Sequence, residues 1–230
     1  MRFCPCPARA FAFTMKKVVL FDLDGTLTDP FNGITNSVAY ALKKFGIDVD
    51  DRRSLACFIG PPLVDSFIEY YGFSRADAET AVVYYREYFA DKGLYENELY
   101  PGVSEMLENL KSQGLHLVLA TSKPERFAKI ILDYFDLTKY FDYVCGASFD
   151  SSRSKKGDVI SYALSTAKVN LCDKIIMVGD RKHDVIGARK NGIDTIGVLY
   201  GYGDESELNE SGAKFVVSTI SELTQLLLKI

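Results

Sequence analysis

One short stretch near the start of the chain, residues 18–29, constrains the fold more than any other part of the sequence. It opens with the apolar run Val18-Val19-Leu20-Phe21 and continues as Asp22-Leu23-Asp24-Gly25-Thr26-Leu27-Thr28-Asp29. A continuous apolar run of this length is typical of a strand that is buried on both faces of a parallel sheet. Because side chains alternate along a strand, we expect Asp22 and Asp24 to leave its end on the same side. Two carboxylates that close repel one another, and a divalent cation is one way to keep both ionised.

The rest of the chain predicts an α/β fold in two parts. After residue 97, segments of helical periodicity alternate with apolar runs that predict strands at 116–120, 143–145, 174–179, 195–198 and 215–217. This alternation indicates a Rossmann-like, doubly wound parallel sheet, in which ligands bind at the carboxyl ends of the strands. Residues 30–96 instead show helical stripes and no credible strand. They are too long for one crossover helix, so we expect an inserted helical domain between core segments 15–29 and 97–230.

Polar residues follow three of the predicted strands. Besides the two aspartates after the first strand, Thr121 and Ser122 follow the strand at 116–120, and Asp180 and Asp184 follow the strand at 174–179. Two adjacent lysines, Lys155 and Lys156, lie near the start of the predicted helix that precedes the strand at 174–179. Each residue alone has an ordinary structural explanation, such as a helix cap or a solvated lysine. Together they form a set of carboxylates, hydroxyls and an amine that suits phosphoryl transfer, in which catalysis is mostly positioning and charge stabilisation.

These segments resemble the four motifs of the haloacid dehalogenase-like (HAD) hydrolase superfamily. Residues 22–29 match motif I, Thr121 matches motif II, and Gly179-Asp180-Arg181-Lys182-His183-Asp184 matches motif IV. Lys156 is favoured for motif III, with Lys155 as the alternative, and Ser122 stands where many relatives have Asn. Two further segments are similar to the phosphoglycolate phosphatase-like subgroup, in which residues 30–96 would be a helical type-1 cap: Gly60-Pro61-Pro62-Leu63 and Val198-Leu199-Tyr200-Gly201-Tyr202-Gly203.

The resemblance implies a role for each of these residues. Asp22 would be the nucleophile that forms an aspartyl-phosphate, and Asp24 would be the general acid and base. Thr121, Ser122 and Lys156 would bind the phosphate oxygens of the substrate. Mg2+ would be held by Asp22, by the backbone carbonyl of Asp24 and by Asp180, with Asp184 binding through water or orienting its neighbours.

We therefore expect a Mg2+-dependent phosphatase that hydrolyses small soluble phosphomonoesters such as phosphoglycolate, nucleoside monophosphates or sugar phosphates. The main alternative is a β-phosphoglucomutase-like phosphomutase. Relatives of that kind usually carry a His early in the cap, and residues 30–45 contain none. A dehalogenase would not need Asp24, a receiver-like signalling domain would be far shorter, and a plain binding protein would not need every catalytic group.

Composition narrows the setting in which the chain works. The 230 residues carry a net charge of −4 without a basic block, which argues against general binding of nucleic acid. No apolar run reaches the ~18 residues of a membrane span. The five cysteines are scattered among apolar segments, as in proteins of the reducing cytoplasm. Residues 1–14 lack clear periodicity, and we expect a disordered tail there. Nothing in the sequence specifies an oligomeric state.

Overall fold

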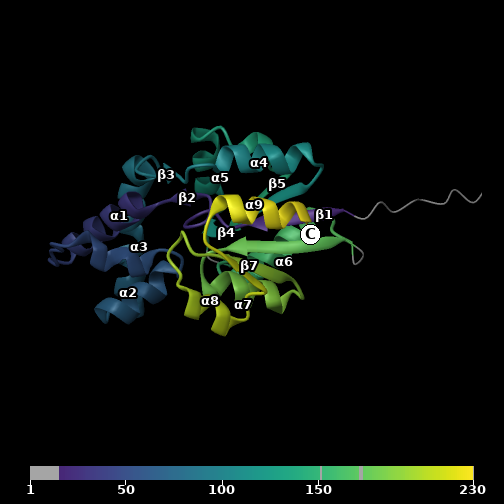
Figure 1. Cartoon of the computed structure of the whole chain (residues 1–230). Coiled ribbons are helices and arrows are strands. Elements are labelled where there is room, and N and C mark those ends of the chain that lie inside the picture. The colour runs from purple at the N-terminus through teal and green to yellow at the C-terminus, as the bar shows by residue number, and fades with distance from the viewer. Residues whose placement is uncertain (1–15, 151, 171–172, 230) are drawn as a thin grey trace, which may run out of the picture.

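A parallel sheet of six strands forms the centre of the computed structural model, which describes residues 16–150, 152–170 and 173–229 (Figure 1). The strand order is β5-β4-β1-β6-β7-β8. The bounds are β1 Lys17–Phe21, β4 His116–Pro124, β5 Tyr143–Ala147, β6 Lys174–Gly179, β7 Asp194–Val198 and β8 Phe215–Val217. Strand β1 lies between β4 and β6, with Val19 opposite Leu117 and Ile176. The predicted doubly wound α/β fold is confirmed.

Helices cover both faces of this sheet because the side chains of β1 are buried on both sides. Val19 and Phe21 belong to one apolar cluster, and Val18 and Leu20 belong to another. The first cluster includes residues of α4 (Val103–Ser112), α5 (Glu125–Tyr134) and α9 (Ile220–Lys229), and the second includes residues of α6 (Lys156–Thr166) and α7 (Lys182–Lys190). Figure 1 shows the two groups above and below the sheet, with α8 (Glu205–Ser211) beside α7.

Residues 30–96 contain helices and no strand, as the sequence predicts. They comprise α1 (Phe31–Lys44), a 3-10 turn (Arg52–Phe58), α2 (Leu63–Tyr71), α3 (Arg75–Tyr88) and a short π-helix (Phe89–Gly93). This segment is flanked by β2 (Thr28–Asp29) and β3 (Glu98–Leu99), which pair in antiparallel fashion as a two-stranded ribbon. In Figure 1 the three labelled helices lie together beyond one end of the sheet. Its role as a separate cap domain stays a prediction.

The structure differs from the expected elements at β4 and at α8, and the short strands β2 and β3 are absent from the predicted set. Strand β4 runs on to Pro124, with an irregular register between Thr121 and Pro124, so Thr121 and Ser122 lie inside the strand rather than after it. Helix α8 was not expected, because Leu208 is its sole fully buried residue and the segment shows no helical stripe.

Two predictions from the sequence concern residues that the structure covers partly or not at all. The disordered tail expected for residues 1–14 lies outside the described residues.

Among the described cysteines, Cys145 is buried and Cys57 is half-buried, and both are free thiols. None of the helices in the described ranges has the length and apolar character that crossing a membrane requires.

Candidate active site

The predicted site residues gather at the carboxyl ends of three neighbouring strands. Asp22 directly follows β1, Asp180 directly follows β6, and Thr121 lies near the end of β4. These strands are adjacent in the sheet, so residues about 100 and 160 positions apart are brought to one edge. The Asp22 N–H donates to Val178 O at 2.9 Å, which continues the β1–β6 pairing up to the first carboxylate.

Three buried aspartates form one cluster at this edge. Carboxylate oxygens of Asp22, Asp180 and Asp184 all lie within 4.8 Å of one another. Asp184 stands in the first turn of α7, where its Oδ2 accepts from the Arg181 N–H at 3.1 Å. Burial, together with the charges of Asp184 and Asp22, raises the pKa of Asp180 well above its usual range. Burial raises the pKa of Asp184 to about 6, against the opposing effect of Lys156.

This cluster fits a hard divalent cation. Asp180 Oδ2 accepts from the Tyr202 N–H at 2.8 Å, but Asp180 Oδ1 is buried and has no hydrogen-bond partner within the described part of the chain. Buried carboxylate oxygens cost free energy unless they are paired or bound to a metal. Mg2+ prefers oxygen ligands of this kind. The Asp24 carboxylate is not a member of the cluster, although the ligand predicted from this residue is its backbone carbonyl.

Of the two candidate lysines, the structure brings Lys156 to the acidic cluster. Its Nζ lies 2.7 Å from Asp22 Oδ1 and 2.8 Å from Asp184 Oδ1, and it also donates to Ala120 O at 3.2 Å. The Lys156 side chain is 4% exposed. Burial opposes its charge, but the charges of Asp184 and Asp22 outweigh burial and raise the pKa of Lys156. Lys155 precedes α6 and is exposed.

A second lysine, Lys123, contacts Asp24, and the sequence analysis did not identify it. Lys123 Nζ lies 2.6 Å from Asp24 Oδ2, and the side chain is 4% exposed. Its Nζ also lies 4.7 Å from the ring centroid of Phe89 in the helical segment. Burial raises the pKa of Asp24, while Lys123 opposes that rise. Strand alternation held a signal, because Lys123 lies two positions after Thr121 and regular alternation would turn both to one face.

A cavity of about 530 Å3 opens above these groups. Asp22, Asp24, Thr121 and Ser122 line it from the sheet, and Lys123 and Lys155 also border it. Residues 30–96 supply much of the opposite wall, namely Ile34, Phe58, Gly60, Pro61, Pro62, Leu63, Val64, Asp65, Arg75, Glu79, Val82, Tyr85, Arg86 and Phe89. The cavity is therefore polar at the sheet, and its helical side combines an apolar part with four charged residues, Asp65, Arg75, Glu79 and Arg86.

Arg52 and Arg53, at the start of the 3-10 turn in residues 30–96, bond to residues that directly precede this turn. Arg52 Nη1 donates to Val49 O at 2.7 Å, and Arg53 pairs with Asp51 at 3.3 Å. Both are exposed and neither lines the cavity. The turn at Gly60–Leu63, in contrast, does reach it.

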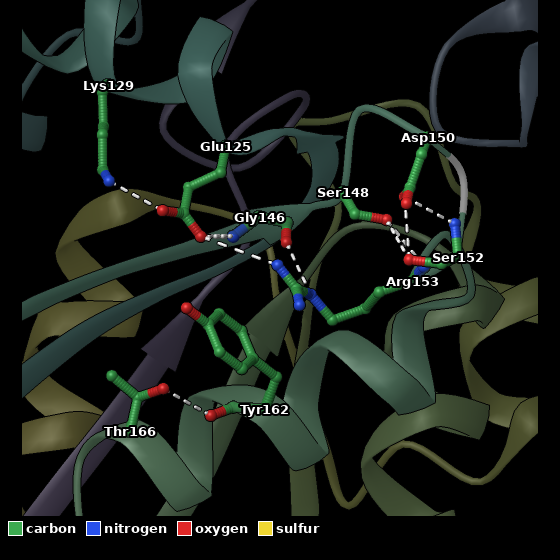
Figure 2. A network of polar contacts seen from close by, with 9 residues as sticks. All are labelled: Glu125, Lys129, Gly146, Ser148, Asp150, Ser152, Arg153, Tyr162 and Thr166. Atoms are coloured by element: carbon green, nitrogen blue, oxygen red, sulfur yellow. Dashed lines mark hydrogen bonds and ion pairs between the residues drawn. The ribbon is translucent and has the colours of Figure 1, made fainter.

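The loop that leads into Lys156 is tied to its surroundings by Arg153 (Figure 2). Arg153 Nε donates to Gly146 O at 3.1 Å, and Nη2 lies 3.8 Å from Glu125 Oε2. The guanidinium carbon lies 3.7 Å from the ring centroid of Tyr162 on α6. These contacts join the end of β5, the start of α5 and the body of α6, and so fix the entry to the helix that carries Lys156.

The same loop also has its own hydrogen-bonded turn, which Figure 2 shows beside Arg153. Asp150 Oδ1 accepts from the N–H and hydroxyl of Ser152, at 3.0 and 2.8 Å. Hydrogen bonds from Ser148 and Ser152 lower the pKa of Asp150 to about 2. Ser148 also accepts from the Arg153 N–H at 2.8 Å, which links this turn to the arginine.

Gly25 allows the chain to turn directly after Asp24, where the backbone lies close to the Asp180 carboxylate. Its φ of +80° lies in the left-handed region, which favours glycine. A Cβ at this position would lie 2.1 Å from Asp180 Oδ2. Any side chain here would therefore displace a carboxylate of the cluster.

Comparisons with known proteins identify the family and relatives of this chain. A family model described as haloacid dehalogenase-like hydrolase matches residues 19–198. The chain is 44% identical over 209 residues to a 5'-nucleotidase of Pseudomonas aeruginosa, covering 91% of this chain and 94% of that protein. It is 38% identical over 213 residues to the tyrosine-protein kinase PtkA of Mycobacterium tuberculosis, covering 92% of this chain and 72% of that protein. Over 220 residues it is 29% identical to phosphoglycolate phosphatase 1 of P. aeruginosa, covering 93% of this chain and 80% of that protein.

A solved structure gives the same result at the level of the fold. The crystal structure of a predicted phosphatase from Clostridium acetobutylicum superimposes with a TM-score of 0.91 at 49% sequence identity, and the match covers 94% of this chain and 100% of that one. The chain belongs to the haloacid dehalogenase-like hydrolase family, as its motifs predict, and is a phosphatase of that family.

Proposed function

We propose that this phosphatase is Mg2+-dependent and hydrolyses nucleoside monophosphates through an aspartyl-phosphate on Asp22. One observation carries the proposal: the buried carboxylates of Asp22, Asp180 and Asp184 lie within 4.8 Å of one another, with the Lys156 ammonium beside Asp22 and Asp184, and Asp22 also lines a cavity of about 530 Å3. A bound Mg2+ would neutralise part of the negative charge of this cluster and orient the phosphoryl group.

The chain's own residues account for the remaining chemistry. Asp22 would attack phosphorus, and two observations support this role: Asp22 borders the cavity, and Lys156 Nζ lies 2.7 Å from its carboxylate. Thr121 Oγ1 accepts from the Lys123 N–H at 3.2 Å, so its own O–H can donate to a phosphate oxygen. Asp24 is the candidate general acid, and its raised pKa favours the protonated form that donates to the leaving oxygen. The same carboxylate then takes a proton from the water that hydrolyses the aspartyl-phosphate.

The cavity favours a substrate larger than phosphoglycolate. Its volume of about 530 Å3 lies inside the range that drug-sized ligands occupy. A two-carbon phosphomonoester would leave the apolar wall from Phe58, Val82 and Phe89 without a contact. A nucleoside would cover that wall. The relative named as a 5'-nucleotidase, at 44% identity, supports the same choice.

Residues 30–96 are proposed to act as a cap over this cavity. Their turn before α2 is held to the sheet side by Arg181, whose Nη1 donates to Ile59 O at 2.8 Å. Arg181 Nε in turn pairs with Glu207 Oε1 on α8 at 2.9 Å. A cap that closes in this way would exclude water from the phosphoryl group.

The proposal is tested with the purified full chain. With MgCl2 it should release inorganic phosphate and free nucleoside from 5'-AMP and 5'-UMP, faster than it releases phosphate from phosphoglycolate. EDTA should abolish the activity, and Asp22→Asn should abolish turnover while the circular dichroism spectrum is unchanged. Activity that survives in Asp22→Asn would refute the nucleophile assignment. A preference for phosphoglycolate would refute the substrate class, and conversion of β-glucose 1-phosphate to glucose 6-phosphate would favour the mutase alternative.

A further inference from the structure

The loop that follows β7, residues 199–203 and called here the clasp loop, contacts both connections between the sheet and the helical segment. Tyr200 donates its O–H to Thr26 O, at 3.1 Å, in the turn that leads into β2. The ring of Tyr200 also lies 5.2 Å, centroid to centroid, from the ring of Tyr100, which directly follows β3. The clasp loop therefore reaches the chain on its way into residues 30–96 and on its way out.

Within this loop, Tyr202 bonds the acidic cluster and the entry to the helical segment at the same time. Its backbone N–H donates to Asp180 Oδ2 at 2.8 Å. Its phenolic O–H donates to Asp29 Oδ1 in β2. The same Asp29 oxygen accepts from the backbone N–H of Phe31, the first residue of α1, at 3.0 Å. One residue thus connects a candidate metal ligand to the first helix of the proposed cap.

Close packing prevents the clasp loop from moving independently of Asp180. A Cβ on Gly201 would lie 2.3 Å from Gly25 O and 2.4 Å from Asp180 Cβ. A Cβ on Gly203 would lie 2.0 Å from Asp180 O. Because the backbone of the loop rests directly on Asp180, a shift of that carboxylate is passed to the position of the Tyr202 ring.

We propose that Tyr202 is a positioning residue that couples the order of the cation site to the order of the cap hinge, defined as β2, β3 and the start of α1. This rests on the proposed function, since it takes Asp180 as a ligand of Mg2+ and residues 30–96 as the cap. Binding of the cation holds Asp180, the clasp loop then holds Asp29 through the Tyr202 hydroxyl, and the hinge opens less often. Coupling of this kind is reciprocal, so a closed hinge also favours binding of the cation.

Hydrogen exchange of the full chain, with MgCl2 or with EDTA, tests the coupling without any substrate. Calorimetric titration with MgCl2 first establishes binding in each variant. In the wild-type protein, saturating Mg2+ should slow exchange in peptides that cover residues 28–36 by about 5- to 150-fold, the range of typical coupling free energies. Tyr202→Phe keeps the N–H to Asp180 and the ring but removes the hydroxyl, so it should bind Mg2+ and lose this gain in protection.

A matched control and a second variant keep the outcome decisive. Tyr200→Phe removes a hydroxyl from the same loop that does not bond to Asp29, and it should keep the Mg2+-dependent gain. The serine of Asp29→Ser can still accept from the Phe31 N–H but is too short to reach Tyr202. This variant should therefore lose the Mg2+-dependent gain in protection, as Tyr202→Phe does. It replaces Tyr202→Phe if that variant does not fold.

Two results would overturn the coupling. One is Mg2+ that binds the wild type without slowing hydrogen exchange in residues 28–36. The other is a wild-type gain in protection of these residues in Tyr202→Phe or in Asp29→Ser. Absence of Mg2+ binding in the wild type would instead refute the proposed function, and the coupling with it.

Discussion

Replacing Lys156 with methionine tests whether this lysine balances the charge of the aspartate cluster. Its Nζ lies within 2.8 Å of both Asp22 and Asp184, and all three side chains are almost fully buried. Methionine has a similar length and no charge, so Lys156→Met removes the ammonium and leaves carboxylates without a cation when Mg2+ is absent. Removing one partner of a buried ion pair costs about 3–5 kcal/mol of folding free energy.

The assay is urea unfolding, in EDTA at pH 8, of the wild-type protein, of Lys156→Met and of Lys155→Met. At this pH Asp184 of the wild-type protein, whose pKa is raised to about 6, is ionised. The chain contains no Trp, so unfolding is followed by circular dichroism. A loss of about 3–5 kcal/mol corresponds to a midpoint lower by roughly 1–3 M urea, for a slope of about 2–3 kcal/mol per M. Lys155→Met is the matched control, because Lys155 is exposed and a surface substitution should change stability by less than about 0.5 kcal/mol.

Two results would refute this reasoning. A loss below about 1 kcal/mol in Lys156→Met would mean that Lys156 does not balance the cluster, because an unpaired buried charge costs more than that. Equal losses in the two variants would mean that the structure assigns the wrong lysine.

Three further predictions concern the same region. At a concentration 100 times its Kd, Mg2+ should stabilise the fold by about 2.7 kcal/mol. The melting temperature is compared between MgCl2 and EDTA at matched ionic strength, and equal values would contradict a cation site at Asp180. Lys123→Met should lower kcat by at least about tenfold, with a smaller change in KM. Without the cation 2.6 Å away, the pKa of Asp24 rises further, and its carboxylate is less able to take the proton from the hydrolytic water. Steady-state kinetics that show a change in KM alone would argue against this role. Burial opposes ionisation of Glu207, but hydrogen bonds from Arg181 prevail and lower the pKa of Glu207. The Glu207 carboxylate therefore contributes to folding stability above about pH 4.5, and this contribution is lost as the pH falls below that value. Glu207→Gln should therefore show less loss of stability than the wild type between pH 5 and pH 3, as measured by urea unfolding, and parallel curves would contradict the pairing.

Much of the fold could be predicted because local signals agreed with one another. The apolar run before Asp22 predicted the central strand, and the hydroxyl and carboxylates after the other strands predicted which edge of the sheet holds the site. The motif favours Lys156 over Lys155, but local sequence does not separate the two, because both lie at the start of the same helix. Burial distinguishes them, since α6 turns Lys156 toward β1 and leaves Lys155 exposed.

Other features had weak local signals or none. Leu208 is the one fully buried residue of helix α8, so the sequence of this helix shows no apolar stripe. The bond between Tyr202 and Asp29 joins residues 173 positions apart, and neither residue carries a local pattern that points to the other. Lys123 had a weak signal in the alternation of β4, but a lysine after a strand is ordinarily solvated, and its ion pair with Asp24 emerges from the packing of Phe89 above it.

The pairing of β2 with β3 bears on how such a protein can diversify. Asp29 and Glu98 are direct partners in the ribbon, so the two ends of the 68-residue stretch between them stand side by side. A stretch whose ends are already adjacent can be lengthened, shortened or exchanged by grafting without strain on the sheet. With residues 30–96 as the proposed cap, chimaeras spliced at this ribbon would exchange the helical wall of the cavity and keep the residues at the strand ends.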